Sequence, residues 1–154
     1  MSSAPGGEEE VRRLLAAYQQ YQAQAEGIVQ QLNLTQLTAE GLERALVAVE
    51  ALNTAEVGQE ILVPIGSGSF IHGSLASKEK VVLNVGAGVS IEKTATEAKE
   101  ILKVRKAEVL EGSKKLNEIL AKIDQEMQKI QAIMQQFEES AHQHQHGPGS
   151  EGVV

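Results

Sequence analysis

Residues 80–89 offer the clearest candidate for chemistry, because an apolar run there enters the turn Gly86-Ala87-Gly88. A strand that enters a Gly-x-Gly turn can cradle the phosphates of a dinucleotide, provided that a third glycine lets the next helix pack closely. Ile91 occupies the position of that third glycine, and the sequence after it has the pattern of a coiled coil. We therefore expect neither a nucleotide site nor any other cofactor.

Histidines form the second candidate. His142, His144 and His146 alternate with glutamine. If a helix extended through them, His142 and His146 would share one face and could bind a divalent metal. The Gly-Pro-Gly-Ser segment that follows favours a solvated tail instead, so we expect no metal site. His72 has no evident catalytic partner, and the many carboxylates alternate with lysines as on solvated helix faces. The sequence predicts a protein that is not an enzyme.

Composition narrows the class of protein further. The 154 residues include two Tyr, two Phe, no Trp and no Cys, so aliphatic stripes must supply the buried surface. The lack of cysteine excludes disulfides, thiolate metal sites and a cysteine nucleophile. A net charge of −7 argues against nucleic acid as a partner. We see no signal peptide and no run of apolar residues long enough for a membrane span, and we expect a cytoplasmic protein.

The first long segment, residues 8–56, has the heptad pattern of a coiled-coil helix. Its weakest stretch is 33–38, where Thr38 could cap a separate helix, although a single unbroken helix is also compatible with the pattern. Gly58 is the expected C-terminal cap. The seam positions are Val11, Leu14, Tyr18, Tyr21, Ala25, Ile28, Leu32, Thr35, Ala39, Leu42, Leu46 and Val49.

The second long segment, residues 94–140, has the same kind of pattern. Thr94 and Glu97 have the spacing of a capping box at its start. Two consecutive steps of four, at 112–116–120, shift the phase of the seam and locally unwind the supercoil. The seam positions are Ala95, Ala98, Leu102, Arg105, Val109, Gly112, Leu116, Leu120, Ile123, Met127, Ile130, Met134 and Phe137.

The insert between the helices predicts two β-hairpins. Strands at 60–65 and 70–75 meet around one Gly-Ser-Gly turn, and strands at 80–85 and 89–91 meet around one Gly-Ala-Gly turn. Pro64 marks an edge position or a bulge. Two isolated hairpins are marginally stable and leave open edges, so we expect strands from other chains to cover them. The residues expected to mediate this assembly are Ile61, Val63, Ile65, Gly66, Gly68, Phe70, Ile71, Val81, Leu83, Val85, Gly86 and Gly88.

The two hairpin segments almost repeat each other. The first reads Ile-Leu-Val-Pro-Ile-Gly-Ser-Gly-Ser-Phe from residue 61, and the second reads Val-Val-Leu-Asn-Val-Gly-Ala-Gly-Val-Ser from residue 81. Together with Glu92-Lys93 and the flanking heptad helices, they resemble the alpha-type subunits of the prefoldin family over residues 8–140. The hairpins carry this resemblance, because having two rather than one separates alpha-type from beta-type subunits. The weak second strand at His72-Gly73-Ser74 departs from the family pattern.

The resemblance implies a fold class and a function. The fold is α+β, mainly α: a long antiparallel coiled-coil hairpin with two β-hairpins at the bend, whose strands join a β-barrel shared between subunits. The expected segments are a disordered N-terminus at 1–7, helix 8–56, hairpins 57–93, helix 94–140 and a disordered tail at 141–154. The family implies a hexamer of two alpha and four beta subunits, which captures non-native client proteins without ATP and delivers them to a group II chaperonin.

Capture of non-native proteins requires exposed and adaptable apolar surface, for which methionine is well suited. Leu15 and Ile133 lie off the predicted seams and yet are apolar, which widens the stripe beyond what helix pairing needs. We predict that the helix tips splay to expose this surface; the alternative is that its residues only close the coil. The predicted client-binding residues are Val11, Leu14, Leu15, Tyr18, Met127, Ile130, Ile133, Met134 and Phe137.

A protein of another class fits the helices equally well. A structural coiled-coil tether would use the insert as a simple dimer interface and would capture no clients. Incubation with a beta-type partner separates the two functions, because a holdase forms a larger complex that prevents aggregation without ATP, whereas a tether persists as an inactive dimer.

Overall fold

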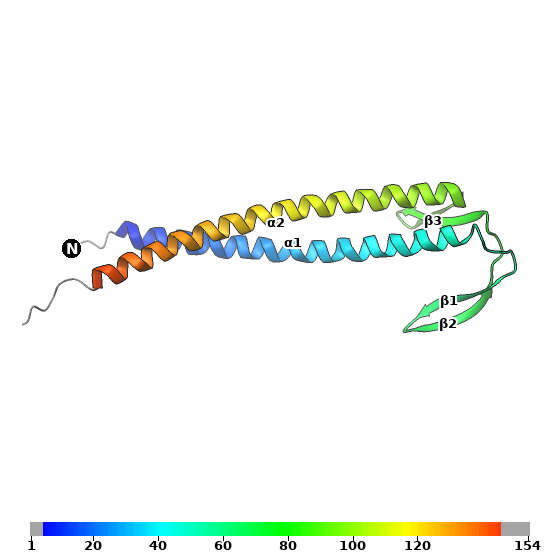
Figure 1. Ribbon diagram of the computed structural model, residues 1–154, viewed down its shortest axis with the longest axis horizontal. Coiled ribbons are helices and arrows are strands. Elements are labelled where there is room, and N and C mark those ends of the chain that lie inside the picture. Colours follow the sequence, from blue (N-terminus) through cyan, green and yellow to red (C-terminus); the bar gives the residue numbers. More distant parts are fainter. Residues whose placement is uncertain (1–4, 146–154) are drawn as a thin grey trace, which may run out of the picture. The chain divides into compact units, whose positions relative to one another are not determined.

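The computed structural model describes residues 5–145, which form two long helices and two β-hairpins (Figure 1). The order is α1 (Pro5–Ala51), β1 (Glu60–Gly66), β2 (Ser69–Ser74), β3 (Lys80–Gly86), β4 (Val89–Thr94) and α2 (Ala95–Gln145). This is the mainly α, α+β fold that the sequence predicts. Residues 5–7 and 141–145 are helical where the sequence predicts disorder, and the other residues of those end segments, 1–4 and 146–154, lie outside the described part.

Helix α1 runs without a break through residues 33–38. The Thr38 hydroxyl donates to the carbonyl oxygen of Leu34 at 2.9 Å, one turn back in the same helix, and so caps no new helix. The helix ends at Ala51, five residues before the expected end, because residues 52–55 continue in tighter turns closed by hydrogen bonds three residues apart. Gly58 is therefore not the helix cap. Its φ of 90° and its N–H, which donates to Leu75 O at 2.7 Å, place it beside the first hairpin.

Two compact units make up the chain, one of residues 34–113 and one of the segments that precede and follow it. Every predicted seam position of α1 is buried or partly buried. In α2 the predicted seam position Gly112 is exposed, whereas Ser113 is partly buried. The two consecutive steps of four therefore lie at 105–109–113, earlier than the sequence predicts. Because Gly112 has no side chain to bury, the apolar pattern alone does not determine whether position 112 or position 113 faces the partner helix.

The hydroxyl of Thr94 accepts the backbone N–H of Glu97 at 3.1 Å, which is the predicted N-terminal cap of α2. Each hairpin is an antiparallel pair, and the weak stretch of β2 is fully paired, with His72 opposite Leu62 and Gly73 opposite Ile61. The hairpin thus continues through the segment that departs from the family pattern.

Each hairpin closes with a two-residue turn in which both residues have positive φ. The φ angles are 51° at Ser67 and 71° at Gly68, and 52° at Ala87 and 75° at Gly88. Positive φ at both central positions defines the type I′ turn, whose twist matches that of the flanking strands. The sequence predicts the role of the glycines but not the left-handed conformation of Ser67 and Ala87, which is uncommon for such residues.

The core of the 34–113 unit forms where β3 packs against both helices. Val49 of α1, Leu83 of β3, and Ala98 and Leu102 of α2 are 7%, 7%, 0% and 4% exposed. The expectation that another chain must bury the apolar residues of the insert is therefore wrong for Leu83, because helices of its own chain cover it. Periodicity identifies an apolar strand face but not the element that covers it.

We predict that Leu83→Ala lowers the free energy of unfolding of the chain by about 2–4 kcal/mol, because it leaves a cavity between three elements. The adjacent Val82 is 68% exposed and serves as the matched control. Val82→Ala is expected to change stability by less than about 0.5 kcal/mol. Urea titration followed by circular dichroism measures both values, and equal losses would show that the β3 contact contributes no core stability.

Candidate functional site

One face of the β1–β2 hairpin is wholly apolar. Ile61 pairs with Gly73 and Val63 with Ile71, so these four residues share a face. Val63 and Ile71 are 38% and 51% exposed. A Cβ atom at Gly73 would lie 3.4 Å from Val63 Cγ2, in contact with another side chain of this face. In the part of the chain that the structure describes, much of this face is open to solvent, as an interface with another chain requires.

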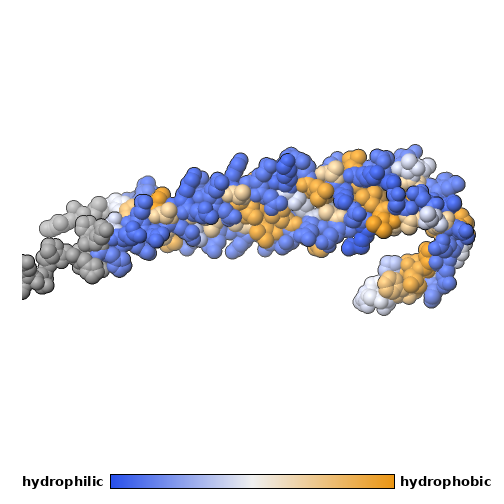
Figure 2. Space-filling model, in the orientation of Figure 1, coloured by the Kyte–Doolittle hydropathy of each residue, from blue (hydrophilic) through white to orange (hydrophobic). Residues whose placement is uncertain are grey.

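The opposite face of the same hairpin is apolar near the turn and charged at the other end. Leu62 and Phe70 are 60% and 56% exposed, with Pro64 beside Phe70 in the register. Further from the turn, His72 Nδ1 lies 2.7 Å from a carboxylate oxygen of Glu60. Figure 2 shows apolar surface on this hairpin. Both faces therefore expose apolar side chains.

The structure divides the predicted assembly residues into three groups. Val81 packs against the core and Leu83 lies within it, so both contribute to the chain's own fold. The glycines form the second group: Gly68 and Gly88 lie in the two turns, Gly66 and Gly86 end the strands before them, and all four have positive φ. The exposed group consists of Val63, Ile65, Phe70, Ile71 and Val85, while Ile61 is partly buried.

The predicted client-binding residues lie in the unit that contains residues 5–33 and 114–145. Leu15, Ile133 and Phe137 are 44%, 40% and 36% exposed, whereas Ile130 is only 7% exposed. The side-chain amide of Gln131 donates to the Tyr18 hydroxyl at 2.9 Å and links α2 to α1 within this unit. Partly buried positions complete the set: Val11, Leu14, Tyr18, Met127 and Met134.

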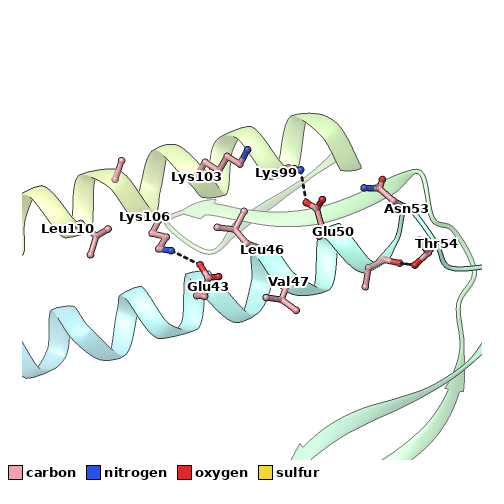
Figure 3. A pocket seen from close by; sticks show the side chains of 12 residues that line it. Glu43, Leu46, Val47, Glu50, Asn53, Thr54, Lys99, Lys103, Lys106 and Leu110 are labelled. Atoms are coloured by element: carbon pink, nitrogen blue, oxygen red, sulfur yellow. Dashed lines mark hydrogen bonds and ion pairs between the residues drawn. The ribbon is translucent and has the colours of Figure 1, made fainter.

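A groove of about 960 Å³ runs between the helices of the 34–113 unit (Figure 3). Val47 and Leu110, which are 62% and 51% exposed, contribute apolar surface. Ion pairs at 2.5 Å join Glu43 to Lys106 and Glu50 to Lys99. The second pair lies seven residues later in α1 and seven residues earlier in α2, so the two helices run antiparallel here. Sequence reasoning missed this surface: Val47 and Leu110 are apolar and lie off the predicted seams, but the sequence alone does not show that their helix faces become neighbours.

Lys99 holds the pKa of the Glu50 carboxyl below its usual value. The main cause is the hydrogen bond from Lys99, and the positive charge of Lys99 is the second. Partial desolvation raises the pKa of Glu50, whereas the positive charge of Lys103 lowers it further. A carboxylate whose pKa is lower in the folded state stabilises that state above the unfolded pKa of about 4.3. This contribution is lost as the pH falls through the folded pKa.

We therefore predict that Glu50→Gln lowers the melting temperature slightly at neutral pH. The difference from wild type should narrow as the pH falls below about 4. Glu111→Gln, which removes an exposed carboxylate of α2 without touching the Lys99 pair, is the control. Thermal melts at several pH values test this, and a constant difference down to acid pH would contradict the assignment to the Glu50–Lys99 pair.

The described residues offer neither a metal site nor a membrane span. No group of three or more acidic or histidine side chains there is placed to hold a metal ion. No helix there is long and apolar enough to cross a membrane. His146 lies outside the described residues, so the absence of a metal site between it and His142 stays a prediction.

Comparison with known proteins agrees with this architecture. Residues 21–139 match the family model described as "Prefoldin subunit". The chain is 55% identical over 118 residues to prefoldin subunit alpha of Methanothrix thermoacetophila, an alignment that covers 76% of this chain and 77% of that protein. It is 32% identical to prefoldin subunit alpha of Pyrococcus horikoshii, over 84% of this chain and 88% of that protein.

A solved structure is similar as well. It is the cryo-EM structure of filamentous PFD from Methanocaldococcus jannaschii, with a TM-score of 0.66 and 26% sequence identity, and the match covers 76% of this chain and 97% of that one. The chain belongs to the prefoldin family, and its curated relatives place it among the alpha subunits. It is therefore a subunit of a prefoldin co-chaperone.

Proposed function

We propose that this subunit captures non-native proteins through apolar side chains of the unit that holds both outer helix segments. Leu15, Ile133 and Phe137 support this proposal, because they are large, apolar and between 36% and 44% exposed. Met127 and Met134 lie near Ile133 and Phe137 in the sequence and add side chains that adapt to different partners. Opening of the Tyr18–Gln131 contact would expose the partly buried seam residues to a client.

The assembly that we propose is a hexamer of two alpha and four beta subunits. Contact with other subunits is supported by the β1–β2 hairpin, which exposes apolar side chains on both faces and has no third strand among the described residues. An isolated two-stranded hairpin of this kind is marginally stable, and strands of other subunits would both cover its faces and pair its edges.

The complex acts in the cytoplasm, catalyses no reaction, and releases its clients to a group II chaperonin without using a nucleotide itself. The sequence supports only the lack of nucleotide use, because Ile91 replaces the third glycine that a dinucleotide loop needs.

One mixing experiment tests the proposed function. The chain is incubated with a prefoldin beta subunit, and the mass of the resulting complex is measured by native mass spectrometry. A chemically denatured protein is then diluted into a solution of the complex without ATP. We expect a mass equal to two alpha and four beta subunits, together with suppressed aggregation as measured by light scattering. A stable dimer that leaves aggregation unchanged would instead identify a tether.

A further inference from the structure

The groove between α1 and α2 lies on a part of the helix pair that β3 does not line (Figure 3). β3 packs against the helices through Leu83, and the carbonyl oxygen of Asn84 accepts a hydrogen bond from Arg105 Nη2 at 2.8 Å. The groove follows a neighbouring stripe of α2, between Lys99 and Leu110. The strands of the chain therefore cover one side of the helix pair and leave the groove open.

The groove has apolar lining and is long enough for a short helix. Val47 of α1 and Leu110 of α2 are 62% and 51% exposed there. The lining from Lys99 to Leu110 extends about 16 Å along α2, which is the length of three turns of α-helix. A helix that packs into a groove between two others buries one apolar stripe of its surface. A groove of this length and lining therefore suits one amphipathic helix.

Two ion pairs determine which residues of α1 and α2 face each other across the groove. Each joins a glutamate of α1 to a lysine of α2 at 2.5 Å: Glu43 with Lys106, and Glu50 with Lys99. Between these pairs, the lining consists of Leu46 on α1 and Lys103 on α2 (Figure 3). The middle of the groove therefore has a lysine on one wall and an apolar side chain on the other.

Lys103 gives the groove an excess of positive charge. Its ammonium pairs with Glu100 of its own helix at 3.8 Å, its side chain is 53% exposed, and no ion pair among the described residues joins it to α1. The lining contains three lysines and two glutamates, although the whole chain has a net charge of −7. A carboxylate beside Lys103 would form a charge-assisted hydrogen bond with it. The groove is therefore complementary to an acidic ligand with an apolar surface.

We propose that this groove binds one amphipathic helix of another protein, about three turns long, with a carboxylate beside the middle of its apolar stripe. The apolar stripe packs on Val47 and Leu110, and the carboxylate pairs with Lys103. A basic helix would bring a like charge to Lys103 and would bind less tightly. This site goes beyond the proposed function, because it recognises a helix of defined charge and not non-native proteins in general.

Three fluorescent peptides of about 14 residues test the proposed charge, each with leucines along one helical face and a glutamate, a glutamine or a lysine beside their middle. These three residues have similar helix propensities, so the peptides differ mainly in charge. Fluorescence anisotropy measures the affinity of each peptide for the complex assembled with beta subunits. We expect the glutamate peptide to bind about threefold more tightly than the glutamine peptide and about tenfold more tightly than the lysine peptide.

Variants of the chain locate the site. Lys103→Glu should reverse the order of affinities, whereas the control Lys114→Glu, at an exposed position of α2 outside the groove lining, should keep it. Val47→Ser with Leu110→Ser should weaken binding of all three peptides roughly tenfold, because the bound helix would bury both side chains. Val104→Ser changes an exposed apolar residue of α2 outside the lining and should leave every affinity unchanged.

Equal affinities for the three peptides, or an order that Lys103→Glu leaves unchanged, would overturn the proposal. Binding to the free chain but not to the assembled complex would also overturn it, because a neighbouring subunit would then occupy the groove. If no complex forms, the affinities of the free chain decide. The mass of the complex and its suppression of aggregation are measured without peptide, so the proposed function and the helix site can each fail while the other stands.

Discussion

A prefoldin complex whose alpha subunits carry Leu15→Ser, Ile133→Ser and Phe137→Ser should keep its native mass but bind denatured protein roughly tenfold or more weakly. All three side chains are more than a third exposed in the subunit, so their replacement removes little buried surface from the helix pair. Burial of each against a client would contribute about 1 kcal/mol, and the three together account for at least a tenfold change in affinity.

The measurement is the concentration of complex that halves light scattering by a diluted denatured protein. Val104→Ser is the matched control, because Val104 is 56% exposed on the same helix as Ile133 but belongs to the other compact unit. We expect the control to behave as wild type. If the triple variant were equally active at unchanged mass, the proposed client surface would be wrong.

Charges on the apolar face of β1–β2 should abolish assembly without unfolding the free chain. Val63 and Ile71 lie opposite each other and are 38% and 51% exposed in the single subunit. In the variant Val63→Asp with Ile71→Asp, both carboxylates are therefore hydrated in the free chain. Burial of each unpaired charge in an interface would cost roughly several kcal/mol, as it does for buried ions in proteins.

Circular dichroism of the free chain and native mass spectrometry of the mixture with beta subunits check this prediction. Helix content should stay at the wild-type level while the complex disappears. Ser67→Asp, which adds a carboxylate at an exposed turn residue that already has positive φ, is the control and should assemble normally. Assembly of the double variant at full yield would exclude this face from the interface.

The sequence was a sufficient guide to the elements of the fold, because each has a local cause. Heptad spacing predicts the seam positions that α1 buries, and the Gly-x-Gly segments predict both hairpin turns. The cap at Thr94 follows from its hydroxyl and the spacing to Glu97. These features depend on neighbours within a few residues, so a pattern in the sequence is enough.

Most of the wrong predictions concern interactions between elements. Leu83 looked like an interface residue because its strand is apolar, but α1 and α2 bury it. Gly58 was predicted to cap the first helix, but its N–H donates a hydrogen bond to the carbonyl oxygen of Leu75, next to the first hairpin. The groove beside Val47 and Leu110 depends on which helix faces become neighbours, and no single-segment pattern contains that information.

The central claim is that clients bind the unit containing Leu15 and Ile133, and photo-cross-linking tests it most directly. A photoreactive amino acid is placed at residue 133 or at residue 104 of the alpha subunit, and the assembled complex is irradiated with a denatured client. Ile133 and Val104 are both exposed apolar positions of α2, at 40% and 56%, but they belong to different compact units. We predict that the client is labelled from position 133 and hardly at all from position 104. Equal labelling from both positions, or stronger labelling from 104, would contradict the account.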